Sequence, residues 1–126
     1  MEDLVARVSA SAGIEPETAQ KAIGIILAFL RKEGPKAEVD ELFATMPGAA
    51  EAAAAAEETG GGMLSGLMGM MGGGLMGLAG RLTGLGLGMG QMQAVGRGLF
   101  EYVREKAGDE RVGQVAAAIP GLSQFL

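Results

Sequence analysis

The sequence predicts an all-α protein in which two short helical repeats pack as a pseudo-two-fold bundle and are joined by a Gly/Met/Leu-rich central segment. Three observations lead to this fold class. Apolar residues recur at spacings of three and four in both flanks, the second flank repeats the pattern of the first, and the uncharged middle holds ten of the 23 glycines. We therefore expect a first helical repeat over residues 1–58, a Gly/Met-rich apolar connector over 59–77 and a second helical repeat over 78–126. A chain of 126 residues supports one hydrophobic core.

The longest helix of the first flank is predicted over residues 16–32. Glu15-Pro16-Glu17 is typical of a helix start, because proline is favoured at the first helical position and carboxylates stabilise the positive end of the helix dipole. Gly34-Pro35 ends the helix. Its apolar residues form a stripe wide enough to imply burial from more than one side: Ala19, Ile23, Ile25, Ile26, Leu27, Phe29 and Leu30.

Shorter helices are expected on either side of this one. Leu4, Val5 and Val8 indicate a helix that ends near Ala12. The next helix carries Val39, Leu42, Phe43 and Met46 and is closed by Pro47-Gly48, and Ala52 to Ala56 has the highest intrinsic helix propensity available.

An internal repeat relates the two flanks at an offset of 73 residues. With a one-residue gap, the match covers roughly residues 4–51 and 78–124. A unit this small cannot bury its apolar stripe alone, so the simplest fold pairs the two copies around a shared core. We expect Ile23, Ile26, Leu30, Leu42 and Phe43 to meet Val95, Leu99, Val103, Val115 and Ile119.

Arg31 and Arg104 occupy equivalent positions in the two copies. Both come late in a predicted helix, where an arginine stabilises the negative end of the helix dipole. A structural role is therefore favoured over a functional one.

These residues also carry a resemblance to small bacterial helical domains of unknown function. The chain most resembles the VcgC/VcgE-type family, with the YidB-like proteins as a looser relative. The resemblance rests on Ala12 to Gln20, Ile25 to Leu30, Pro47-Gly48, Leu85-Gly86-Leu87, Leu99 to Lys106 and Ala118 to Leu122. It implies an all-helical fold and no established activity, and it supplies no catalytic residues. Where members have a polar residue before the long helix, this chain has Gly88-Met89-Gly90.

The central segment combines an apolar seam with repeated glycines. Leucine and methionine recur at alternating spacings of four and three, as in a coiled-coil seam, and glycines four residues apart let helix backbones approach closely. A helix would need a packing partner or a bilayer to offset about 8 to 10 kcal/mol lost through ten glycines. The residues predicted to mediate interaction are Leu64, Met68, Met71, Leu75, Leu78, Gly66, Gly69, Gly73, Gly77 and Gly80.

Three interpretations of this segment stay open: a flexible linker, a helix packed within an oligomer, or a membrane-inserted element. A linker explains the glycines but not the methionine and leucine content. The uncharged stretch of residues 59–80 is long enough to span a bilayer, yet it lacks flanking Trp or Tyr.

Catalytic chemistry has little support in the composition. The chain has no His and no Cys, which removes the commonest general base, the thiol nucleophile and the usual zinc sites. The glycine motif of residues 72–77 lacks the preceding strand and following acid of a dinucleotide site. Met68, Met70 and Met71 could offer thioethers to Cu(I), but packing is the better interpretation. Glu38, Asp40 and Glu41 are the remaining candidates for carboxylate chemistry. We predict no catalytic, cofactor-binding or metal-binding residues and no cofactor.

The charge of the chain argues against a nucleic-acid partner. The net charge is −5, and residues 1–58 hold 11 acids and 5 bases. Phosphate binding needs clustered Lys and Arg, so a nucleic-acid partner is not expected. No small-molecule substrate is evident. The amino terminus lacks a secretory signal, which predicts a cytoplasmic location.

The sequence thus predicts a non-enzymatic interaction or scaffold protein that forms a homo-oligomer through its centre. The alternative is a membrane-associated protein whose residues 59–80 insert into the bilayer.

Overall fold

The computed structural model describes residues 2–34, 36–46, 48–59 and 75–118, and these form helices without any strand. This confirms the predicted all-α class. The helices are α1 (Glu2–Ala12), α2 (Pro16–Glu33), α3 (Lys36–Thr45), α4 (Ala49–Thr59), α6 (Leu75–Gly84), α7 (Met89–Ala107) and α8 (Asp109–Ala118).

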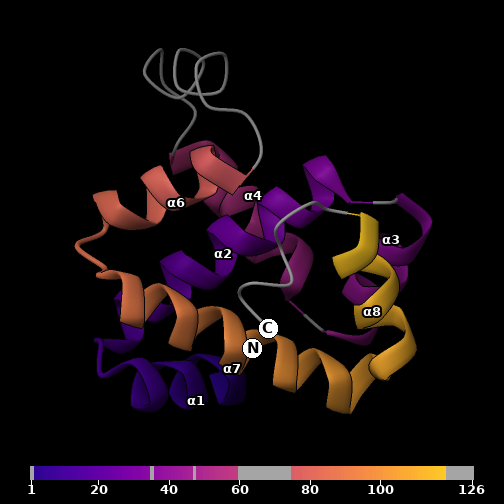
Figure 1. Cartoon of the computed structure of the whole chain (residues 1–126), viewed down its shortest axis with the longest axis horizontal. Coiled ribbons are helices and arrows are strands. Elements are labelled where there is room, and N and C mark those ends of the chain that lie inside the picture. Colours follow the sequence, from indigo (N-terminus) through magenta and orange to yellow (C-terminus); the bar gives the residue numbers. More distant parts are fainter. Residues whose placement is uncertain (1, 35, 47, 60–74, 119–126) are drawn as a thin grey trace.

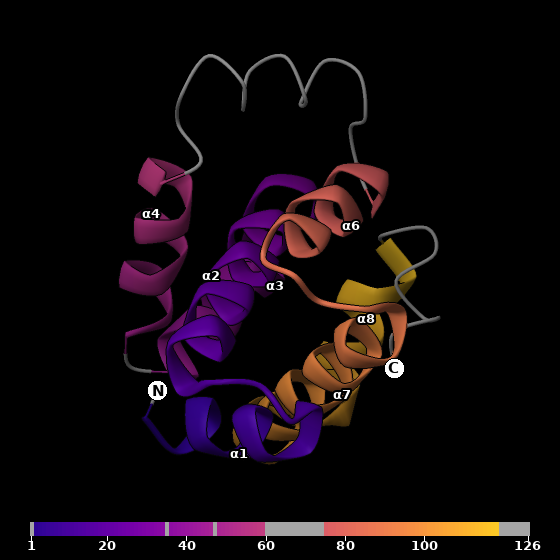
Figure 2. The same ribbon diagram turned by 90° about the vertical axis from the view of Figure 1, so that its left-hand side faces the viewer.

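Helix α2 forms the centre of the molecule. Pro16 opens it as predicted, and its last turn is closed by the Gly34 N–H, which donates to the Leu30 carbonyl at 2.7 Å. Every residue from Ala22 to Leu30 is buried. Helices α1, α3, α4, α6 and α7 all pack against α2, and Figure 2 shows α2 between α4 on one side and α6 and α7 on the other. The prediction of burial from more than one side is confirmed.

The turns that precede the two long helices are alike. Gly13 and Gly86 both adopt positive φ, +67° and +88°, which is the usual way to end a helix on glycine. The Ile14 N–H donates to the Ser9 carbonyl at 3.1 Å, and the Leu87 N–H donates to the Leu82 carbonyl at 3.4 Å.

The final turn of α6 is tighter than that of α1. Its amides bond three residues back, from Leu85 to Leu82 and from Gly86 to Thr83, whereas the Gly13 amide bonds four residues back to Ser9. A three-residue turn takes one residue fewer, so it absorbs the one-residue gap between the two aligned flanks.

The core is one cluster of buried side chains drawn from both flanks. The residues expected to meet are found in it, with two exceptions. Phe43 is half-buried and packs against the cluster, and Ile119 lies outside the described residues. The confirmed members are Ile23, Ile26, Leu30, Leu42, Val95, Leu99, Val103 and Val115.

The helix contacts agree with a pseudo-two-fold in part. α1 packs on α7 and α6 packs on α2, so each short helix contacts the long helix of the other flank, and α3 packs on α8 (Figure 1). However, α1 also packs on α2, while α6 has no comparable contact with α7. α4 covers α2 without a described counterpart on α7. The pseudo-two-fold arrangement therefore stays a prediction.

The predicted connector, residues 59–77, overlaps the ends of two helices. α4 continues to Thr59, and α6 already begins at Leu75. Residues 60–74 lie outside the described residues. The two predicted repeats share one core.

Candidate interaction surface

The predicted interaction residues fall into two groups. Leu75, Leu78, Gly77 and Gly80 belong to α6. The others lie outside the described residues: Leu64, Met68, Met71, Gly66, Gly69 and Gly73.

Leu78 belongs to the core of the single chain. It is 4% exposed, and Leu82, one turn further along α6, is 1% exposed. α6 packs on α2, so the apolar face of α6 stabilises the fold itself. A partner could contact Leu78 only if α6 left its place.

The exposed apolar surface is instead found where α6 turns into α7. Met89 is 75% exposed, and it is the exposed large hydrophobic side chain among the residues whose burial is described, which do not include Leu75 and Met76. Gly84, Gly86 and Gly90 have open space where a Cβ would stand. We call residues 83–94 the uncharged corner, because they contain no Asp, Glu, Lys or Arg.

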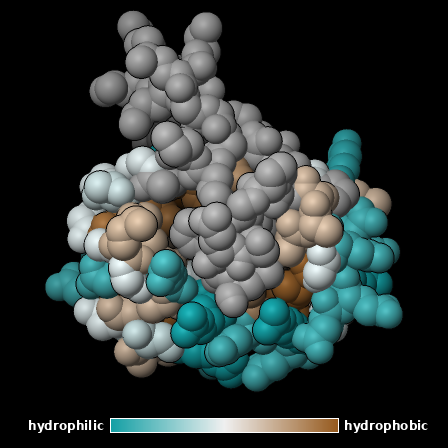
Figure 3. All heavy atoms as spheres, in the orientation of Figure 1, coloured by the Kyte–Doolittle hydropathy of each residue, from teal (hydrophilic) through white to brown (hydrophobic). Residues whose placement is uncertain are grey.

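The rest of this side of the molecule differs in character. Pale and tan residues are prominent at the left of Figure 3, where α6 and the start of α7 lie, and teal residues dominate its lower and right parts. The uncharged corner follows the uncharged central segment in sequence, with Arg81 and Leu82 between them. Among the described residues, the uncharged corner is therefore the candidate interaction surface.

The carboxylates considered for catalysis lie on the surface of α3. Glu41 pairs with Arg111 of α8, with Oε2 at 2.7 Å from Nη1, and Asp40 is exposed. Glu38 is half-buried. Within the described residues no group of three or more acidic side chains is arranged to hold a metal ion. Glu41 serves to link α3 to α8.

A polar cluster that the sequence did not reveal joins α1 to α7. Tyr102, the single tyrosine of the chain, is 7% exposed. The guanidinium of Arg7 lies 5.8 Å from its ring centroid and the ammonium of Lys106 lies 5.6 Å from it, distances at which a cation is attracted to the ring. Arg7 also donates from Nη1 to Glu105 Oε2 at 3.1 Å.

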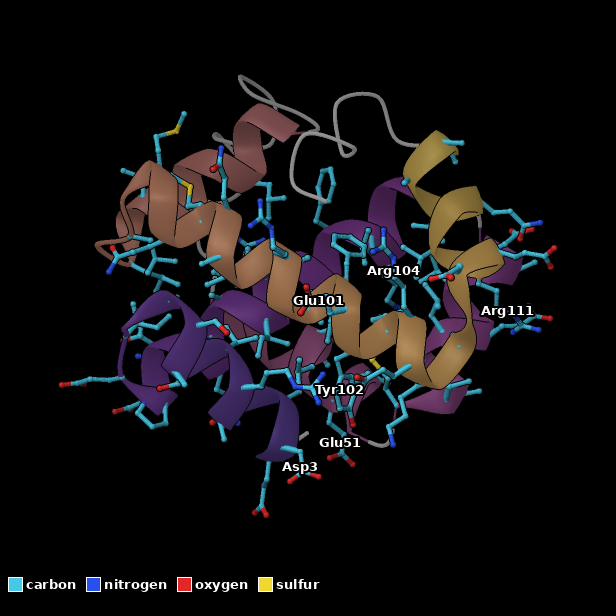
Figure 4. The ribbon with its side chains drawn as sticks, turned by 60° about the horizontal axis from the view of Figure 1, so that its bottom comes forward. Asp3, Glu51, Glu101, Tyr102, Arg104 and Arg111 are labelled. Carbon is cyan, nitrogen blue, oxygen red and sulfur yellow. The ribbon has the colours of Figure 1, made fainter. Side chains whose placement is uncertain are left out.

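The geometry of this cluster indicates a structural role, which is to join α1 to α7. Figure 4 shows Tyr102 on the side of α7 that lies towards α1 in this view. The contacts of Arg7 with Tyr102 and Glu105 hold the two helices together at the edge of the core, whereas the contact of Lys106 with Tyr102 lies within α7. No sequence signal could have found it, because Arg7 and Glu105 are 98 residues apart.

Close packing between α1 and α7 has a second cause at Gly98. A Cβ added there would lie 3.2 Å from Val8 Cγ2 and 3.8 Å from Val8 Cα. The absence of a side chain at Gly98 thus lets α1 approach α7 closely.

The equivalent arginines are placed as the structural interpretation requires. Arg31 and Arg104 are both exposed in the last turns of α2 and α7. Arg104 Nε lies 3.6 Å from Asp109 Oδ1, at the start of α8.

Comparison with known proteins gives no relative: no protein-family model matches the chain, and no curated protein or solved structure matches it. The similarity to the VcgC/VcgE-type family therefore stays a prediction from the residues quoted above.

None of the described helices combines the length and the apolar character needed to cross a bilayer.

Proposed function

We propose that this chain is a non-enzymatic helical interaction or scaffold protein of the cytoplasm, related to the VcgC/VcgE-type family. It forms homo-oligomers through its Gly/Met/Leu-rich centre, and its action is packing rather than chemistry. Nucleic acid, cofactors and small-molecule substrates play no part in this proposal.

One observation carries the proposal: the described helices use their large apolar side chains inside their own core. Among the residues whose burial is described, Met89 is the exposed large hydrophobic residue, at 75%, and Val5, Ile14, Phe43 and Leu85 are partly buried against the core. Residues 60–74, outside the described helices, add further leucines and methionines to the sequence. Apolar residues in that number, without charge among them, favour association with a second apolar surface.

The described contacts guide the design of the test. Leu78 is unsuitable, because a charge at a buried core position would unfold the chain and mimic a loss of association. The triple variant Leu64→Glu, Met68→Glu, Met71→Glu places charge along the predicted seam outside the described helices. We expect it to lower the native mass, measured by sedimentation velocity, to that of one chain while the thermal melting curve persists.

The matched control is Ala50→Glu on the exposed side of α4, which adds charge away from the centre. It should leave the native mass unchanged. An unchanged mass in the triple variant, or a monomeric parent protein, would reject self-association through the centre.

Cell fractionation distinguishes this proposal from the alternative, in which residues 59–80 insert into a bilayer. An alkaline carbonate wash strips peripheral proteins from membranes and leaves inserted ones. The scaffold proposal requires the protein in the fraction that stays in solution, and a dispersed protein that resists the wash would favour the membrane alternative.

A further inference from the structure

We propose that self-association exchanges halves: the first half of one copy, residues 2–59, packs with the second half of another copy, residues 75–118. The partner is a second copy of this chain, and each core is then completed by the other molecule. This inference rests on the proposed self-association, which supplies the second copy.

The boundary between the two halves has the anatomy of a protein–protein interface. Its centre is apolar, because buried residues of α1 and α2 join those of α6 and α7 in one cluster. Ion pairs lie at its rim, between Arg7 and Glu105 and between Glu41 and Arg111. An apolar centre with a polar rim is the usual organisation of such interfaces.

The second half is not compact without the first. α6 packs on α2 and makes no comparable contact with α7, although α7 is its neighbour in sequence. α7 in turn is covered by α1. Helices α6 and α7 of the second half thus both depend on surfaces that belong to residues 2–59.

A single covalent connection joins the halves, from Thr59 to Leu75. The contacts across the boundary do not depend on which chain supplies each half, so a closed copy and an exchanged pair share the same core. The equilibrium between the closed copy and the exchanged pair is set by the connecting segment and by the local concentration of the second copy. Association of the uncharged centres raises that concentration.

Cross-linking between copies tests the exchange, and the chain has no cysteine to interfere. Two full-length variants are mixed, unfolded and refolded together: Arg7→Cys in one and Glu105→Cys in the other. These positions face each other across the boundary. A short bismaleimide should join the two chains in the exchanged pair and give a product of twice the chain mass.

A second pair, Glu41→Cys with Arg111→Cys, probes a different place on the same boundary, between α3 and α8. Both pairs should cross-link, since exchange reproduces the whole boundary. The control mixes Arg7→Cys with Glu17→Cys, both exposed and both in the first half. We expect each cross-half pair to give about tenfold or more dimer product than this control.

The doubly substituted chain Arg7→Cys/Glu105→Cys checks the reach of the reagent, because it should cross-link in either arrangement. Dimers by sedimentation without cross-half products would overturn the exchange and leave self-association intact. A protein that sediments as one chain would overturn both.

Discussion

Helices α2 and α7 are matched by the sequence alignment of the two flanks but are covered differently. From Ala22 to Leu30, every residue of α2 is buried, whereas the matching residues 95–103 of α7 are buried except at two exposed positions. At an offset of 73, buried Gly24 and Ala28 of α2 correspond to exposed Arg97 and Glu101 of α7.

The difference is explained by α4. This helix packs on α2, and its inward residues Ala49 and Ala53 are fully buried. Small side chains on both helices allow a short distance between their axes. We infer that α4 covers the Gly24 and Ala28 face, while the same face of α7 carries charge because water covers it. Where the two aligned helices differ in these few residues, one is covered by a neighbouring helix and the other by solvent.

The largest effect is expected when residue 28 of α2 is replaced by the glutamate that α7 has at the matching position, Glu101. Ala28→Glu would bury a carboxylate under α4 without a partner, and we expect it to lower the free energy of unfolding by about 3 kcal/mol or more. The reciprocal variant Glu101→Ala, at an exposed site, should change it by less than about 0.5 kcal/mol. Urea unfolding followed by circular dichroism measures both. Equal effects would show that α4 does not shield this face.

A second test asks whether both halves belong to one cooperative core. Leu27 and Phe100 are equivalent and almost fully buried, at 0% and 2% exposed. Leu27→Ala and Phe100→Ala should each cost about 2 to 5 kcal/mol and shift one single transition. Two separate transitions in calorimetry would argue for independent halves.

A third test concerns the position at which α2 has Ile25 and α7 has Gly98. Gly→Ala within a helix normally gains up to about 1 kcal/mol in propensity. We expect that gain at Gly113 of α8, where nothing lies within 4 Å of an added Cβ.

At Gly98 the new methyl group meets Val8, which is fully buried. Gly98→Ala should therefore be less favourable than Gly113→Ala by about 1 kcal/mol or more, by chemical denaturation. Adding Val8→Ala should reduce the penalty of the new contact. If Gly98→Ala stabilised as much as Gly113→Ala, the close approach of α1 would be disproved.

The smallest effect is expected at the ion pair between α3 and α8. The side chains of Arg111 and Glu41 are 38% and 55% exposed, so Arg111→Ala should cost only about 0.2 to 1 kcal/mol. The difference from the parent should shrink in high salt, because screening weakens exposed pairs. Lys36→Ala, at an exposed residue of α3, is the control. A loss that is insensitive to salt would indicate packing by the Arg111 stem.

The predicted interaction site could be read from sequence only in part. The apolar seam and the glycine spacing marked residues 64–80, but they did not separate Leu78, which the fold buries, from residues beyond the described helices. Periodicity identifies the apolar face of a helix and not what covers it. The exposed Met89 was missed for the same reason, because burial depends on helices distant in sequence.

Local chemistry determined the helices of this protein. Pro16, Gly34, Gly13 and Gly86 mark ends that depend on backbone preferences of single residues, and three- and four-residue spacing marks the stripes that become the core. Tertiary structure decided the rest. It determined that α4 packs on α2, that α1 lies against Gly98, and that Arg7 lies over the ring of Tyr102. These choices depend on contacts between distant residues, and no short segment carries the energy that selects them.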